Sequence, residues 1–208
     1  MITVKEMSDF EKFAAVQDYI IFYISFVSDF IRQNLGEEAE MDLRKLWEQG
    51  EQSIPDNASD HRKYEIAYRN WLWMATSNFK FFNQRLGAHG LILYELEEAK
   101  ALNKKNRTPA LAVLGLIRAI SPEYAFRRTS KQFAYQLQWL TPYTISEMTG
   151  DRLVVDIPQC KILEYPDTED VCLIACQKIY PRWAAGQFMV NMAFERQNHH
   201  CTCTITPL

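Results

Sequence analysis

The first part of the chain repeats apolar side chains every three or four residues, which is the spacing of an α-helix. Over residues 4–35 two such stripes run side by side. The first consists of Phe13, Val16, Ile20, Ile24, Val27 and Ile31, and the second of Tyr19, Phe22, Phe26 and Phe30. A helix with so wide an apolar face is buried on more than one side. We therefore predict a helix that lies in a core or at a subunit interface and ends at Gly36.

Helical patterns continue as far as about residue 139. The predicted helices cover residues 37–50, 60–86, 91–103, 110–120 and 122–139. Gly87 and Gly90 mark the end of the 60–86 helix, and the polar stretch from Asn103 to Pro109 predicts a loop. The front of the chain is therefore expected to be a helical bundle.

After residue 140 the apolar period shortens and turn residues become frequent. The segments 143–148 and 153–157 predict two strands, joined by a turn at Thr149–Asp151. Residues 168–179 predict a helix, and two further strands follow around Gln197–His200. The predicted fold class is α+β, an N-terminal helical bundle followed by a small antiparallel β-β-α-β-β unit. We expect a helical region over residues 1–140 and a mixed region over 141–208, sharing one core.

Composition limits the classes of function. Apolar residues make up 48% of the 208 positions, which is ample for a folded core. The net charge is −3 with no basic block, so we predict no nucleic-acid partner. The apolar run at residues 19–27 is shorter than the roughly 20 residues that span a bilayer, and no charged-then-apolar leader precedes it. The short apolar run and the lack of a leader predict no membrane partner. Together with the odd number of cysteines, they also predict reduced thiols and a cytoplasmic location.

All five cysteines fall between residues 160 and 203. Cys172 and Cys176 are four apart and share one face of the predicted helix, while Cys201 and Cys203 share one face of a strand. If the helix covers that strand face, four thiols converge. A reactive pocket, a metal site and a small apolar core are all compatible with this clustering.

The spacing of the strand cysteines is unfavourable for a metal. Alternate residues on a strand are roughly 6.5–7 Å apart, whereas a C-x-x-C knuckle chelates zinc well. We therefore predict no metal ligand and no cofactor. Free cysteine also packs as a small hydrophobe, and it becomes a nucleophile only where a cation, an imidazole or a helix N-terminus lowers its pKa.

Three polar residues near the cysteines are candidates for acid and base chemistry. His199 and His200 precede Cys201, but only one of them can share its strand face, and an exposed turn is the alternative. Asp156 lies between Val155 and Ile157, where burial would raise the pKa of its carboxyl and suit a general acid. The alternative is that Asp156 faces solvent on the outer side of the hairpin.

The C-terminal tail of the chain resembles part of a known protein family. The run Val155–Cys160, then Cys172-x-x-x-Cys176, then Phe194–Ile205 with Cys201 and Cys203, resembles the C-terminal half of the L-2-amino-thiazoline-4-carboxylic acid hydrolase-like family. The β-β-α-β-β order behind helices is more distantly similar to the vinyl-reductase and Golgi-transport-particle type of ligand-binding domain. The resemblance covers residues 140–206.

The resemblance implies a hydrolase-like enzyme that attacks a C=N or amide-like carbon of a small heterocycle in an apolar pocket. Cys176 or Cys201 would be the nucleophile, His199 or His200 the base, and Asp156 the acid. The alternative is a non-catalytic domain that binds a small ligand or pigment. A homodimer through the doubly striped first helix is compatible with either function.

Overall fold

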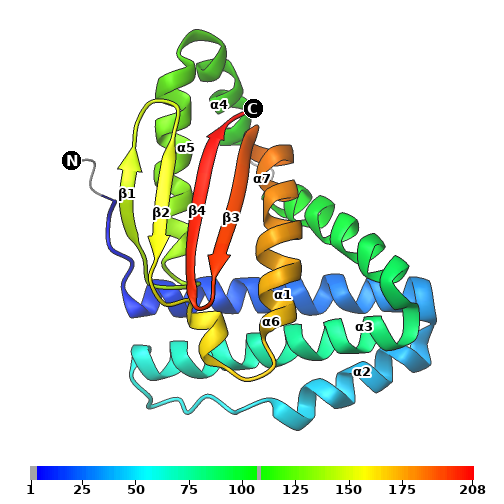
Figure 1. Ribbon diagram of the computed structural model, residues 1–208. Helices are drawn as coiled ribbons and strands as arrows, with labels where there is room; N and C mark the ends of the chain where they lie inside the picture. The colour runs from blue at the N-terminus through cyan, green and yellow to red at the C-terminus, as the bar shows by residue number, and fades with distance from the viewer. Residues whose placement is uncertain (1–3, 107–108) are drawn as a thin grey trace. The chain divides into compact units, whose positions relative to one another are not determined.

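The computed structural model describes residues 4–106 and 109–208. Figure 1 shows a series of helices, then two strands, a further helical stretch and two last strands. Of these described residues 68% are helical, and four strands form an antiparallel sheet, so the predicted α+β class is confirmed. In chain order the elements are α1 (Asp9–Leu35), α2 (Glu37–Gly50), α3 (Asp60–Lys105), α4 (Pro109–Ile120), α5 (Pro122–Leu137), β1 (Thr144–Met148), β2 (Leu153–Ile157), η1 (Lys161–Glu164), α6 (Glu169–Val171), η2 (Cys172–Ile179), α7 (Tyr180–Phe188), β3 (Val190–Gln197) and β4 (His200–Pro207).

The contacts within the chain define two compact units. One comprises residues 7–94, and the other comprises residues 95–208 together with residues 4–6. The C-terminal unit therefore contains α4 and α5 as well as the sheet. The sequence placed the division at residue 140, where the secondary structure changes from helix to strand. That the two predicted regions share one core stays a prediction.

Helix α1 begins later than the pattern predicted because Ser8 caps it. The Ser8 hydroxyl accepts a hydrogen bond from the Glu11 amide at 3.2 Å, and the Glu11 carboxylate accepts one from the Ser8 amide at 2.8 Å. This reciprocal arrangement satisfies two backbone donors that the helix start leaves free. At the other end Gly36 has φ 89° and its amide donates to the Arg32 carbonyl, so the predicted end is confirmed.

Among the described residues, α1 alone is long and apolar enough to cross a membrane by length and composition. The sequence predicted that the apolar run of residues 19–27 is too short to span a bilayer. That holds for the run itself, whereas the whole of α1 is long enough. Core helices pass the same test, and several α1 side chains, Tyr23, Val27 and Ile31 among them, are buried in the 7–94 unit. The absence of a membrane partner stays a prediction.

Helix α3 consists of two helical segments that meet at Gly87, as the sequence predicted. Gly87 has φ 64° and ψ −168°, a conformation that side chains with a Cβ rarely adopt. Beyond the bend, Tyr94 packs its ring against Phe82 and Phe30, with ring centroids 4.6 and 5.3 Å apart. This aromatic cluster forms part of the core of the 7–94 unit.

The sheet of the C-terminal unit has the strand order β1-β2-β4-β3, so β4 lies inside it (Figure 1). Side chains on one face of β2 and β4 are buried. They are Leu153, Val155, Ile157, Cys201, Cys203 and Ile205. Alternate positions on the other face are only partly buried. The strand pattern therefore sorts the tail into one core face and one polar face.

An aromatic cluster in the C-terminal unit joins α5 to α7. Phe133 of α5 lies with its ring centroid 5.4 Å from that of Trp183 and 4.7 Å from that of Phe188. Such edge-on pairs add to the apolar area that they bury. The continuous helical stretch from α6 through η2 to α7 is thereby fixed at its C-terminal end, which leaves its first turns at the end of the sheet where β3 and β4 turn.

A glycine pair tests the bend in α3. We expect Gly87→Ala to lower the free energy of unfolding by about 1–3 kcal/mol, because alanine is strained at this φ and ψ. Gly115→Ala, within α4 and with open space around its added Cβ, should raise it by about 0.5–1 kcal/mol. Urea unfolding followed by circular dichroism measures both, and equal stability of the two variants would contradict the assignment.

Candidate functional site

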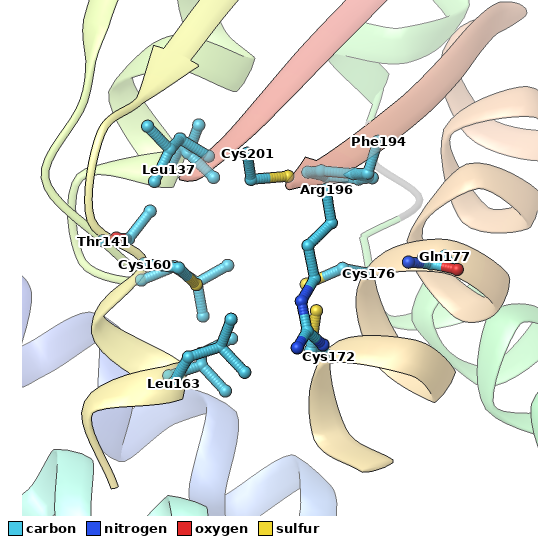
Figure 2. A pocket seen from close by; sticks show the side chains of 13 residues that line it. Leu137, Thr141, Cys160, Leu163, Cys172, Cys176, Gln177, Phe194, Arg196 and Cys201 are labelled. Atoms are coloured by element: carbon cyan, nitrogen blue, oxygen red, sulfur yellow. The ribbon is translucent and has the colours of Figure 1, made fainter. Parts of the chain in front are cut away.

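Four of the five thiols converge on one cavity in the C-terminal unit. Figure 2 shows Cys160, Cys172, Cys176 and Cys201 around it. Cys160 follows β2, Cys172 and Cys176 belong to η2, and Cys201 belongs to β4. All five cysteines are free and buried, and Cys203 does not line the cavity. The expected convergence of helix and strand thiols therefore occurs, with Cys160 in place of Cys203.

The sheet brings an arginine to the same place. Cys201 pairs with Ile157 of β2 on one side and with Arg196 of β3 on the other, so the three side chains form one row across the buried face. Phe194, two residues before Arg196, lies on the same face. Alternation along β3 thus directs a cation toward the thiols.

The β3–β4 turn and an acidic side chain hold Arg196 in position. Its Nε donates to the carbonyl of Asn198 at 2.9 Å, within a two-residue turn in which Asn198 has φ 57°. Its Nη2 donates to Glu169 of α6 at 3.4 Å. The guanidinium therefore reaches from the strand to the first turn of the helical stretch, where Figure 2 shows it beside Cys172.

Cys172 is the thiol best placed to ionise. A hydrogen bond from the Cys176 thiol and then one from Arg196 lower the pKa of Cys172 from 9.0 to about 6, against the opposing effects of burial and Glu169. Cys172 also lies in the first turn of the helical stretch that begins at Glu169, where the helix dipole favours an anion. Cys172 is therefore the cysteine of the C-terminal unit that ionises most readily.

The other thiols stay protonated. Donating its proton to Cys172, together with complete burial, raises the pKa of Cys176 well above 9.0. Burial raises the pKa of Cys160, and it raises the pKa of Cys201 to about 12. Burial likewise raises the pKa of Cys203. The thiolate is thus confined to one sulfur, with a neutral thiol as its hydrogen-bond donor.

The predicted acid and base residues lie away from the thiols. His200 Nε2 lies 2.7 Å from Asp156 Oδ1 on the less buried face of the sheet, opposite to Cys201. His199 occupies the turn with an exposed side chain, and its carbonyl accepts a hydrogen bond from the Cys160 amide. Of the five predicted catalytic residues, the structure brings Cys176 and Cys201 together at the cavity and leaves His199, His200 and Asp156 outside it.

Sequence reasoning missed Arg196 and did not single out Cys172 as nucleophile. A signal for Arg196 was available, because it stands at an alternate position from Phe194 and so on the core face of its strand. A cation at such a position needs a partner, since an unpaired buried charge is costly. Nothing in the sequence separated Cys172 from Cys176, because helical spacing puts both on one face.

The thiol cavity is small. Its volume is about 20 Å³, and its walls are mostly apolar, with Leu137, Leu140 and Leu163 beside the thiols. A single water needs roughly 10–15 Å³ measured in this way, so the cavity holds a molecule of about that size. A five-membered heterocycle requires the cavity to open.

No group of three or more His, Cys, Asp or Glu side chains is arranged to hold a metal ion among residues 4–106 and 109–208. The four thiols at the cavity come from η2, from β4 and from the segment between β2 and η1, and they surround an apolar space.

A larger cavity, of about 380 Å³, lies in the unit of residues 7–94. Trp47 and Trp73 contribute to its walls, with Arg44 and Glu48 beside them. Asn70 fastens the adjoining loop with two hydrogen bonds of 2.9 Å to the backbone of Gln52. Its volume falls in the range of small-molecule sites.

Comparison with known proteins found no significant match to a family model, to a curated protein or to a solved structure. The resemblance of the tail to the thiazoline hydrolase-like family therefore stays a proposal.

Thiol labelling tests the assignment of the thiolate. We expect iodoacetamide, a small reagent without a ring, to modify Cys172 first, with a rate that falls as the pH drops through about 6, because protonation removes the nucleophile. Arg196→Gln should move this midpoint to higher pH, since it removes a donor to the thiolate. Peptide mass spectrometry across a pH series measures both.

Asp156→Asn is the matched control for that experiment. It lies on the other face of the sheet and should leave the Cys172 profile unchanged. Fastest labelling at Cys201 or Cys203, or a Cys172 rate that rises only above about pH 8, would contradict the assignment.

Proposed function

We propose that the C-terminal unit carries out covalent thiol chemistry on a small electrophilic molecule, with Cys172 as the nucleophile. The observation that carries this proposal is the Cys172 sulfur, which receives hydrogen bonds from Cys176 and Arg196 at the wall of a cavity. A thiolate is the reactive form of cysteine, and activation by a neighbouring cation is a recognised way to obtain it. The resemblance supplies the reaction class, hydrolysis at a C=N or amide-like carbon.

In this reaction Cys172 attacks the electrophilic carbon and forms a covalent intermediate. Cys176 already directs its proton at the Cys172 sulfur, so it is placed to protonate a leaving nitrogen. It takes the role that the sequence assigned to Asp156. Arg196 faces the negative charge that develops during attack. Water then releases the product from the sulfur.

A substrate larger than water needs the guanidinium of Arg196 to release Glu169 and swing out of the cavity while it stays beside the Cys172 sulfur. Its ion pair with Glu169 is 3.4 Å long and the Glu169 side chain is 76% exposed, so this pair contributes only about 0–1 kcal/mol. The displaced guanidinium would be free to bind a substrate carboxylate through two hydrogen bonds. Arg196 thus favours an acidic substrate, in agreement with the carboxylic acid of the resembled family.

The alternative function is non-catalytic binding of a small ligand, and the 380 Å³ cavity among residues 7–94 favours it. Trp47 and Trp73 offer flat apolar walls, while Arg44 and Glu48 offer polar contacts. A homodimer through α1 and a cytoplasmic location stay predictions, and neither function depends on them.

An activated ester tests the thiol chemistry. We expect p-nitrophenyl acetate to acetylate Cys172, because its leaving group departs without a proton donor. Cys172→Ser should reduce adduct formation at least about tenfold, since a hydroxyl is far less nucleophilic than a thiolate. Intact mass and peptide mapping measure the adduct, with Cys203→Ala as the control for loss of a buried thiol. Equal acetylation of wild type and Cys172→Ser would exclude the proposal.

Native mass spectrometry tests the alternative. A binding domain should retain an organic molecule that denaturation releases. Trp73→Ala should lower its occupancy severalfold, because it removes one aromatic wall of the cavity, whereas Cys172→Ser should not change it. Protein that carries no ligand, or ligand lost from Cys172→Ser and kept by Trp73→Ala, would contradict binding in this cavity.

A further inference from the structure

The thiol cavity has a size and chemistry that the hydrolytic proposal does not use. In its closed form it has room for a molecule only slightly larger than water, and that space adjoins the Cys172 and Cys176 sulfurs. Four thiols, one guanidinium and apolar walls surround it. Oxidants with two heavy atoms fit such a space, whereas ring compounds do not.

We propose that Cys172 and Cys176 are a reversible redox pair, in which a small hydroperoxide oxidises Cys172 and Cys176 then closes a disulfide with it. This inference goes beyond the proposed function, because it needs no organic substrate and no movement of Arg196.

The groups around Cys172 suit attack on a peroxide. Arg196 lies beside the Cys172 sulfur and favours its negatively charged form. The guanidinium has five N–H donors. Asn198 and Glu169 each accept from it, and further donors remain to stabilise the oxygen that leaves. The apolar walls hold few water molecules that could compete with the peroxide for the cavity. Redox-sensitive cysteines share these features of thiolate character and a neighbouring thiol that can form a disulfide.

The reaction balances with a hydroperoxide as the only oxidant. The Cys172 thiolate attacks one peroxide oxygen, an S–O bond forms, and the O–O bond breaks. The sulfur loses two electrons, and the departing hydroxide, or alkoxide, takes the Cys176 proton. The resulting Cys176 thiolate attacks the Cys172 sulfur, the S–S bond forms and the S–O bond breaks. The hydroxide released takes a proton from solvent, so one hydroperoxide yields one disulfide. A small dithiol then supplies two electrons and two protons, becomes a disulfide itself and restores both thiols.

The helix geometry selects Cys176 as the partner. Residues four apart in an α-helix have Cα atoms about 6 Å from each other, within the range of about 4.4–6.8 Å that a disulfide spans. Cβ atoms at this helical spacing are about 5–6 Å apart, however, and a disulfide needs about 3.5–4.5 Å, so closing the bond requires the backbone of the π-helical segment Cys172–Ile179 to shift locally. Cys176 is also the thiol that donates to Cys172, whereas Cys160 precedes η1 and Cys201 belongs to β4.

The experiment uses reduced full-length protein treated with hydrogen peroxide, quenched with acid and alkylated under denaturing conditions. Trypsin places both cysteines in the peptide of residues 162–178, and chymotryptic cleavage after Leu173 separates them. We expect this peptide to lose two hydrogen atoms, and its halves to remain joined after the second cleavage until a reductant is added.

Variants separate the two steps. Cys176→Ser should stop at a sulfenic acid on Cys172, which dimedone traps, and Cys172→Ser should leave Cys176 reduced. Cys203→Ala, a buried thiol outside the cavity, should react as the wild type does. Arg196→Gln should slow oxidation at neutral pH roughly tenfold or more, because it reduces the thiolate fraction. Cumene hydroperoxide, which the closed cavity excludes, should react at least about tenfold more slowly than hydrogen peroxide.

Three results would overturn the proposal. They are a Cys172 that stays reduced while Cys201 or Cys203 is oxidised, a disulfide from Cys172 to Cys160 or Cys201, and a disulfide between two chains. Each is visible in wild-type protein, so none depends on the folding of a variant. Acetylation of Cys172 without disulfide formation would leave the hydrolytic proposal standing and exclude this one, and disulfide formation without acetylation would do the reverse.

Discussion

The inner position of β4 determines where the reactive groups of the C-terminal unit lie. Because β4 pairs with β2 on one side and with β3 on the other, its register is fixed twice, and a slip by one residue would turn Cys201 and Cys203 to the polar face. The same pairing places Arg196 opposite Cys201. The thiol cavity is therefore a consequence of strand register, completed by the helical stretch that covers the end of the sheet.

Arg196 is the group whose burial has to be compensated at this site. A guanidinium on the core side of a strand loses hydration, and it needs acceptors around it. The structure supplies the Asn198 carbonyl, the Glu169 carboxylate and the Cys172 sulfur. The Cys172 thiolate thus stabilises the partly buried Arg196 cation, and Arg196 in turn lowers the pKa of Cys172. One proton held by Cys176 serves both sulfurs, so Arg196 faces two negative groups, the Cys172 thiolate and the Glu169 carboxylate.

Much of the fold followed from periodicity. Strand β2 and helix α2 have the predicted bounds, and Gly36 and Gly87 end helical segments where the sequence placed those ends, because capping and positive φ are local properties. The start of α1 was placed too early because apolar periodicity says nothing about a cap, which Ser8 and Glu11 form. The two compact units could not be foreseen from secondary structure, since they depend on which side chains pack together.

The candidate site was less accessible to sequence reasoning for a similar reason. Helical and strand spacing correctly grouped the thiols, but adjacency in sequence pointed to His199 and His200, and a strand turns neighbouring side chains to opposite faces. His200 accordingly contacts Asp156 on the polar face, whereas Arg196, four positions earlier, faces Cys172. Which thiol ionises depends on contacts between α6, η2 and β3. Those contacts join residues far apart in the chain, and only the folded structure assigns the charge to Cys172.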